Sequence, residues 1–309
     1  EDPQPTDPVP TELDNPRWIR IIKPVFDLMG TVPGYYEFDI SFIFLFFLTV
    51  FFAMIVGDAG YGFIFFSLPF AIFVKKKVSK QEIPLTITLL LVFSVSTIVW
   101  GAITGTWFGH AAIAQNTFLS TFIIKPIHSF NPRSSVTIQK ICFVLGTIHI
   151  SIAHVWGFIK GLKTKPRIKA FSQFGWLLAV LGLFYVVLYI VIDPDKYPIP
   201  TYALVMILVG VVSVIIFDKQ ENDGFFKGLL RGLGGIMPTF LDSISAFTDI
   251  ISYIRLFAVG LATVEIAKSF NEMAAGVGQG VIGIIAGIII ILIGHGLNLL
   301  MASLSVIVH

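Results

Sequence analysis

Long apolar stretches, each bounded by charged residues, constrain the fold of this 309-residue chain more than any other feature. A helix that crosses the hydrocarbon core of a bilayer needs about 20 mostly apolar residues. Eight stretches meet or approach this length, at about residues 40–57, 59–74, 85–108, 141–159, 170–192, 197–217, 238–270 and 277–309. Only 13% of all residues are charged, roughly half the share in soluble domains. The pattern excludes a soluble enzyme or a nucleic-acid-binding module, and it predicts an all-α integral membrane protein with eight transmembrane helices.

The basic residues of the loops predict the orientation of these helices. With the N-terminus in the cytoplasm, twelve basic residues fall in the inner loops: Lys75, Lys76, Lys77, Lys80, Lys160, Lys163, Lys165, Arg167, Lys169, Lys219, Lys227 and Arg231. Five fall in the outer loops: Lys125, Arg133, Lys140, Lys196 and Lys268. Because Lys and Arg are enriched on the cytoplasmic side, both termini are expected there. The alternative is six spans, with residues 39–74 as a re-entrant pair.

The last two apolar stretches differ from the first six in length. A helix of about 33 residues is roughly 50 Å long, so in a bilayer it must tilt, protrude or break. A Gly- and Ala-rich loop at residues 271–280 separates the two, and glycines along the second favour close helix packing. We therefore expect three parts: a Pro-rich lead-in at residues 1–37, a six-helix bundle at 38–231, and two long, strongly tilted helices at 232–309.

Arg255 is the most costly residue to place in a membrane. It lies near the middle of the seventh stretch, where an arginine costs about 2.5–3.5 kcal/mol on insertion scales. Asp249 and Glu265 in the same stretch lack the three- or four-residue spacing of a helical ion pair. Compensation must come from a carboxylate elsewhere in the chain, such as Asp58, from a water-filled cavity, or from a second protein. The face of Arg255 carries only small or slender residues, which are Thr248, Ser252, Val259 and Ala262.

Histidines form a second group of polar residues within the apolar stretches. His295 and Asn298 are spaced to share one helix face, and His309 ends the chain. His149 and His154 lie in the fourth stretch. An intramembrane histidine can relay protons or act as a hydrogen-bonding strut. The spacing fits no compact metal site, and no Gly-Lys pair of a nucleotide-binding loop occurs, so neither a metal nor another cofactor is expected.

A glycine-rich motif joins the first two stretches: Gly57, Asp58, Ala59, Gly60, Tyr61 and Gly62. The glycines permit a tight turn or a close helix approach, and Asp58 is placed to cap the second helix. The motif is therefore expected to be structural. The segment at residues 100–109 contains two tryptophans and is expected to anchor the chain at the membrane interface.

Four motifs in order along the chain resemble one known family. They are Val-Pro-Gly-Tyr-Tyr-Glu-Phe-Asp at residues 32–39, the glycine motif at 57–62, Ser-Tyr-Ile-Arg-Leu-Phe-Ala at 252–258, and Gly-His-Gly-Leu-Asn at 294–298. Together they resemble the membrane domain of the stator subunit of V-type and A-type rotary ATPases, called subunit a or subunit I.

The resemblance implies a function in ion transport, with the proton as the expected ion. In this family the last two helices lie against a rotor ring of small membrane subunits, each of which carries a carboxylate. Arg255 matches the arginine that separates two aqueous half-channels. By the same resemblance, the expected ion-path residues are Ser252, Arg255, Glu265, His295, Asn298 and His309. The chain would not be an enzyme by itself and would need no cofactor.

Members of the family also have segments that this sequence lacks. A cytoplasmic N-terminal domain, which would contact the peripheral stalk and the ATPase sector, is absent, as is a second arginine beyond His309. We therefore expect a truncated chain, from a prokaryotic plasma membrane rather than a vacuolar one. The alternatives from the residues alone are a secondary transporter that binds its substrate at Arg255 and a purely structural stator anchor. No internal repeat of the kind common in transporters is visible.

Overall fold

A computed structural model describes residues 13–308, except 32–33, 35–36, 223 and 279. Every regular element within these residues is helical. The first predicted family motif lies partly outside the described residues, and His309 lies wholly outside them. The chain forms two compact units, Glu1–Pro132 with Ala258–His309, and Arg133–Phe257.

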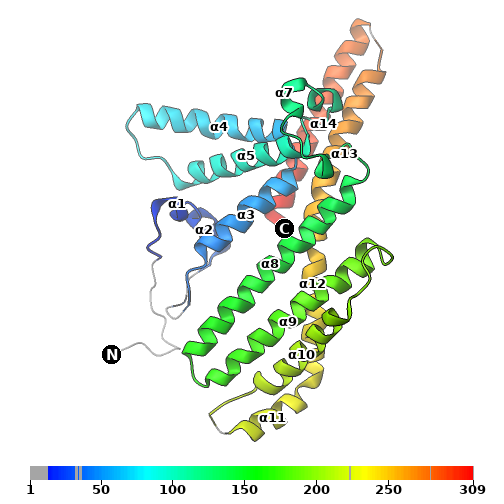
Figure 1. The fold of residues 1–309 in the computed structure, drawn as a ribbon. Coiled ribbons are helices and arrows are strands. Elements are labelled where there is room, and N and C mark those ends of the chain that lie inside the picture. The colour runs from blue at the N-terminus through cyan, green and yellow to red at the C-terminus, as the bar shows by residue number, and fades with distance from the viewer. Residues whose placement is uncertain (1–12, 32–33, 35–36, 223, 279, 309) are drawn as a thin grey trace. The chain divides into compact units, whose positions relative to one another are not determined.

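The first unit is built on apolar helices from both ends of the chain. Its helices are α1 (Arg17–Arg20), α2 (Lys23–Met29), α3 (Ser41–Val56), α4 (Ala59–Val78), α5 (Leu85–Thr104), α6 (Ala111–Ala114), α7 (Thr117–Ser120), η1 (Lys125–Ile127), most of α13 (Ile254–Gly276) and α14 (Val281–Val308). Helices α4 and α5 pack together, and α5 also contacts α3 (Figure 1). Buried Val56, Tyr61, Ala267 and Ala302 form a core that joins α3, α4, α13 and α14.

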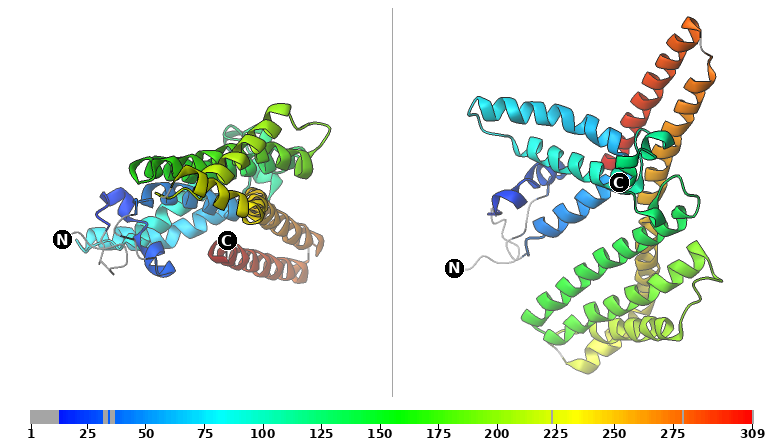
Figure 2. Two further views of the ribbon diagram at one scale, coloured as in Figure 1. Left: turned by 90° about the horizontal axis from the view of Figure 1, so that it is seen from below. Right: turned by 45° about the horizontal axis from the view of Figure 1, so that its top comes forward.

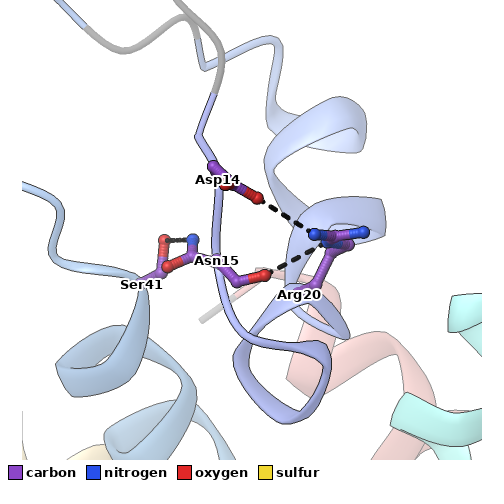
Figure 3. A network of polar contacts seen from close by, with 4 residues as sticks. All are labelled: Asp14, Asn15, Arg20 and Ser41. Carbon is purple, nitrogen blue, oxygen red and sulfur yellow. Dashed lines mark hydrogen bonds and ion pairs between the residues drawn. The ribbon is translucent and has the colours of Figure 1, made fainter.

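A polar network ties the segment before α1 to the first residue of α3 (Figure 3). Arg20 donates to the Asp14 carboxylate at 3.1 Å and to the backbone oxygen of Asn15 at 3.2 Å. The buried Asn15 side chain in turn donates to the Ser41 hydroxyl at 3.0 Å. Since Asp14 and Arg20 are exposed, their ion pair adds little stability, and the buried Asn15–Ser41 bond holds the lead-in against α3.

The second unit is a bundle of long helices. Its elements are α8 (Ser134–Lys163), η2 (Arg167–Lys169), α9 (Ala170–Val187), the π-helical turn η3 (Leu188–Ile192), α10 (Thr201–Phe217), α11 (Phe225–Gly234) and α12 (Ile236–Ser252). Helix α9 lies between α8 and α10, as both figures show (Figure 1 and Figure 2). Glycines allow the close contact: a Cβ atom on Gly175 would lie 2.7 Å from the backbone oxygen of Gly210.

Six helical segments among the described residues are long and apolar enough to cross a membrane. They are Ala59–Val78, Leu85–Thr104, Ser134–Lys163, Arg167–Ile192, Ile236–Gly276 and Val281–Val306. Helices α3 and α10 are also apolar, but they have only 16 and 17 residues. The prediction of an all-helical, multi-pass membrane protein is therefore confirmed, and each of the six long segments overlaps one of the predicted stretches. The count of eight spans stays a prediction.

The seventh predicted helix is interrupted. The segment Ile236–Gly276 has 41 residues, and a turn at Tyr253 divides it into α12 and α13. Hydrogen bonds with a three-residue spacing tighten the chain there: Tyr253 donates to Ile250 at 3.3 Å, and Leu256 donates to Tyr253 at 3.1 Å. The helix is therefore broken two residues before Arg255, and its strong tilt in a membrane stays a prediction.

Two further features of the fold differ from the sequence expectations. Helix α13 continues to Gly276, so the first residues of the predicted loop at 271–280 are helical. The short helix α11 lies between α10 and α12 and was not predicted. It turns its glycines inward, with Gly228 and Gly232 buried, and leaves Phe226 and Leu230 exposed.

Candidate functional site

Arg255 lies in the second unit at the start of α13, and its side chain is exposed. The guanidinium Nε donates to the backbone oxygen of Ser252 at 3.1 Å, across the turn at Tyr253. The Ser252 hydroxyl donates to the backbone oxygen of Asp249 at 2.7 Å. Ser252 and Arg255 are therefore brought together, but through the backbone of Ser252 rather than through its hydroxyl. Arg255 is 19 residues from the start of the apolar segment Ile236–Gly276 and 21 from its end.

The Tyr253 side chain fixes the turn that precedes Arg255. Its ring packs on α8 at Gly146, where any side chain would collide with the ring. Its hydroxyl is 2.8 Å from Nδ1 of His149 on α8. His149 was predicted only as a polar residue within a span, and the structure gives it this contact. His154, also on α8, has a different partner. Its Nδ1 lies 3.0 Å from the amide oxygen of Gln173 on α9.

Glu265 lies in the first unit, on the part of α13 that follows Ala258. Its carboxylate is 3.7 Å from the ammonium group of Lys268, one turn further along the same helix. About half of each side chain is exposed, at 53% and 42%. An exposed pair of this kind contributes little to stability, and the Glu265 side chain lies at the surface of the helix.

His295 and Asn298 do lie together, as their spacing predicted, in a partly buried polar network of the first unit. Nδ1 of His295 is 2.7 Å from the Tyr61 hydroxyl on α4. The Asn298 amide nitrogen donates to the same hydroxyl at 2.9 Å and to the backbone oxygen of Thr263 at 2.7 Å. The network thus connects α14 to α4 and α13, and Asn298 is fully buried.

The other side of the His295 ring faces α13. Its Nε2 is 3.1 Å from the amide oxygen of Asn271, and the Asn271 amide nitrogen donates to the backbone oxygen of Phe108 at 2.7 Å. Asn271 was missed as a site residue because the sequence placed it at the start of a loop. A single polar side chain one residue after an apolar run carries no signal that separates a helix residue from a loop residue.

Asp58 caps α4 as predicted, and it also holds a second segment. Its Oδ1 accepts hydrogen bonds from the backbone N–H groups of Gly60 at 2.8 Å, Tyr61 at 3.2 Å and Phe108 at 2.9 Å. Its Oδ2 accepts one from Gly109 at 3.0 Å. The segment at residues 100–109 was expected to be an interface anchor. The backbone N–H groups of its last two residues donate hydrogen bonds to the Asp58 carboxylate.

The glycines around Asp58 lie where the backbone turns or where neighbouring groups approach closely. Gly57 has a φ of 69°, in the left-handed region that favours glycine, and ends α3. A Cβ atom on Gly60 would lie 2.6 Å from the ring of Phe108, and one on Gly62 would lie 2.8 Å from Ile98. The motif therefore allows α4 to pack closely against α5 and the segment that follows it.

The candidate site residues fall into two groups. Ser252 and Arg255 belong to the second unit, whereas Glu265, His295 and Asn298 belong to the first. His309, the last predicted ion-path residue, lies outside the described residues. Within the described part of the chain, no group of three or more His, Cys, Asp or Glu side chains is placed to hold a metal ion. The polar side chains can instead hold, orient or exchange protons and fix charges.

Comparisons with known proteins give a consistent result. No family model matches the chain. The V-type ATP synthase subunit I of Borreliella burgdorferi is 41% identical over 311 residues, which cover 100% of this chain and 51% of the relative. Subunit I 1 of the V-type ATP synthase of Treponema pallidum is 35% identical, over 100% of this chain and 49% of the relative. The A-type ATP synthase subunit I of Methanocaldococcus jannaschii is 28% identical, over 100% and 46%.

The chain spans about half the length of these curated relatives. The similarity nevertheless extends over all four motifs, the six long helical segments and both groups of site residues. Over its whole length, this chain is homologous to the subunit I proteins of V-type and A-type ATP synthases.

Proposed function

We propose that this chain is the ion-translocating membrane part of the stator subunit of a V-type or A-type rotary ATPase, and that the ion is a proton. One observation carries the proposal: Arg255 is exposed near the middle of a 41-residue apolar segment, beside a turn in the helix. Ser252 and the exposed Thr248 precede it on α12. A positive charge among small side chains suits a carboxylate that approaches closely and then leaves.

The physical mechanism needs no covalent step in this chain. A carboxylate on a rotor subunit stays neutral while it faces lipid, because a charge there is costly. Within about 4–6 Å of Arg255, its pKa falls by about 1–3 units, so it releases its proton. At about 4 Å and an effective dielectric constant of about 20, the attraction is about 4 kcal/mol. That energy is enough to hold the carboxylate briefly and small enough to let it go.

Arg255 also gives the movement of the rotor a direction. An ionised carboxylate does not pass back into lipid until it binds a proton from a second aqueous half-channel. One charge that crosses about 100 mV gains about 2.3 kcal/mol, so several protons must be coupled to each nucleotide converted elsewhere in the complex. We assign Ser252, Glu265, His295, Asn298 and His309 to the lining of the two half-channels. The selectivity for H⁺ over Na⁺ would lie in the carboxylate site of the rotor.

The arrangement in the membrane is part of the proposal. We infer that α3 and α10 cross in addition to the six long segments, because the loop charges then separate into twelve inner and five outer basic residues. Both termini would be cytoplasmic. Residues 38–231 would form a supporting bundle, and residues 232–309 would face a rotor ring of small subunits that carry carboxylates.

The remaining partners follow from the same proposal. Residues 1–37 would lead in from a cytoplasmic domain that contacts the peripheral stalk and the ATPase sector, where the nucleotide chemistry takes place. This chain would be non-catalytic. The bacterial and archaeal sources of its relatives support a prokaryotic plasma membrane.

A substitution at Arg255 tests the proposal. We expect Arg255→Ala, in the complete complex in sealed vesicles, to abolish ATP-driven proton uptake while the complex still assembles. The matched control is Arg231→Ala, which removes an arginine on α11 that pairs with Glu221 at 2.7 Å and should preserve uptake. Proton uptake that survives Arg255→Ala would refute the proposal. Loss of assembly in Arg255→Ala alone would favour a structural anchor instead.

A further inference from the structure

The hydrogen bonds around His295 form a chain whose direction is fixed at both ends by backbone carbonyl groups. One end is the carbonyl of Thr263 on α13, and the other is the carbonyl of Phe108. A carbonyl oxygen can only accept a hydrogen bond. Each carbonyl therefore fixes the orientation of the asparagine amide that donates to it: Asn298 at Thr263 and Asn271 at Phe108.

The hydrogen bonds that begin at Thr263 lead through Asn298 and Tyr61 to Nδ1 of His295. The group of Asn298 that faces the Thr263 carbonyl at 2.7 Å must be its NH2 group. The same nitrogen is 2.9 Å from the Tyr61 oxygen and donates its second hydrogen there. The Tyr61 hydroxyl hydrogen is then free for His295 Nδ1 at 2.7 Å. Nδ1 is placed to accept that hydrogen bond, and because a tyrosine oxygen can also accept a second one, the Phe108 end decides whether Nδ1 carries a hydrogen.

The Phe108 end fixes the role of Nε2 independently. The Asn271 NH2 group must face the Phe108 carbonyl at 2.7 Å, which leaves the Asn271 amide oxygen toward His295. That oxygen is 3.1 Å from Nε2 and can only accept a hydrogen bond. Nε2 must therefore carry the hydrogen. A neutral imidazole carries one hydrogen, so Nδ1 carries none and accepts the hydrogen bond that Tyr61 is placed to donate.

We propose that Tyr61 and Asn271 are positioning residues that hold His295 in this one neutral tautomer. His295 then serves the ion path, if the proposed function holds, as a fixed bridge from α14 to α4 and α13, and not as a proton carrier. A proton can reach Nδ1 only after the Tyr61 hydroxyl turns its hydrogen away. The buried Asn298 oxygen, which accepts no hydrogen bond from the described residues, is the spare acceptor in the network.

The charges on the surrounding helices do not overturn this assignment. On the α4 side, Asp58 acts on His295 electrostatically, but its two oxygens already accept four backbone hydrogen bonds. On α13, Glu265, Lys268 and Glu272 are the charged residues near the network in sequence, and Glu265 and Lys268 pair with each other. Helix α3 carries no ionisable side chain.

Nitrogen NMR on the full chain tests the tautomer directly. The chain would be labelled with ¹⁵N-histidine and reconstituted in lipid vesicles, and the His295 signals would be identified by their loss in His295→Gln. We expect one unprotonated Nδ1 and one protonated Nε2 at about pH 7. Tyr61→Phe removes the hydrogen bond to Nδ1, so the Nδ1 signal should shift while Asn271 keeps the hydrogen on Nε2. Tyr202→Phe, on α10, makes the same chemical change in the other unit and should leave the His295 signals unchanged.

Two results would overturn the proposal. The first is a wild-type His295 that carries its hydrogen on Nδ1, or on both nitrogens. The second is a Tyr61→Phe spectrum identical to that of the wild type. If Tyr61→Phe does not fold, the wild-type spectrum alone still decides the tautomer. The NMR readout does not depend on ion transport, so the predicted tautomer in an inactive chain would count against the proposed function only.

Discussion

At the scale of single residues, the polar side chains in the apolar segments are satisfied in two ways. Asp58 is buried, and its carboxylate accepts hydrogen bonds from four backbone N–H groups. Arg255 is exposed, and its Nε bonds to the chain at the preceding turn. The first arrangement fixes the fold, because four donors from two segments converge on one side chain. The second leaves a charged group at the surface, where a partner can reach it.

The first prediction concerns Asp58. An asparagine there offers one acceptor oxygen in place of two. Its NH2 group would therefore face either the N–H group of Gly109 or the three N–H groups that now donate to Oδ1. We expect Asp58→Asn to lower the free energy of unfolding by about 1–3 kcal/mol, the cost of one buried unsatisfied donor. Calorimetric unfolding of the full chain in detergent measures the change. Asp27→Asn, at an exposed position on α2, is the control, and an equal effect of both substitutions would contradict the prediction.

At the scale of helices, glycines decide how closely neighbours approach. Gly294 on α14 faces the ring of Phe270 on α13, and a Cβ atom there would collide with the ring. Gly296, two residues further along α14, has no atom within 4 Å of a Cβ at its position. The many small residues of α14 therefore do not act alike, and only those that face a neighbour allow packing.

This difference gives a matched pair of substitutions on one helix. Gly294→Ala should destabilise the chain by about 1–3 kcal/mol, because it overfills a packed contact. Gly296→Ala should leave the stability unchanged or raise it by up to about 1 kcal/mol, since alanine favours a helix more than glycine does. Thermal unfolding in detergent separates the two variants. Equal midpoints would show that α13 and α14 do not pack through Gly294.

The helices themselves could be predicted from sequence, because one short-range property determines them. A run of about 20 apolar residues in lipid must satisfy its backbone internally and so forms a helix. The predicted stretches therefore contain α3, α5, α10 and α14 almost at their observed bounds. The amphipathic helix α11 was missed because polar and apolar residues alternate along its ten residues, so no long apolar stretch marks it. At the break, the Tyr253 ring packs against Gly146, a contact across more than a hundred residues that spacing along the chain does not reveal.

At the scale of the whole molecule, the site was predicted only in part. Arg255 could be found because one charge in an apolar run is visible without a structure, and the His295–Asn298 pair follows from helical spacing. The partners Tyr61, Thr263 and Asn271 could not be derived in this way, because contacts across 24 to 237 residues decide them. Spacing within a helix predicts a shared face, but it does not predict which other helix covers that face.

The final prediction separates eight crossing helices from an arrangement in which only the six long segments cross, and a reversal of sidedness makes it testable. If α3 and α10 cross together with the six long segments, Gln81 lies inside and Thr121 outside. If only the six long segments cross, Gln81 lies outside and Thr121 inside, while Val277 lies outside in both arrangements. We therefore expect a membrane-impermeant thiol reagent, applied to whole cells, to label Thr121→Cys and Val277→Cys but not Gln81→Cys. Replacing the single native cysteine, Cys142→Ala, removes the background. Labelling of Gln81→Cys with protection of Thr121→Cys would reduce the count to six, and protection of Val277→Cys would reverse the proposed orientation.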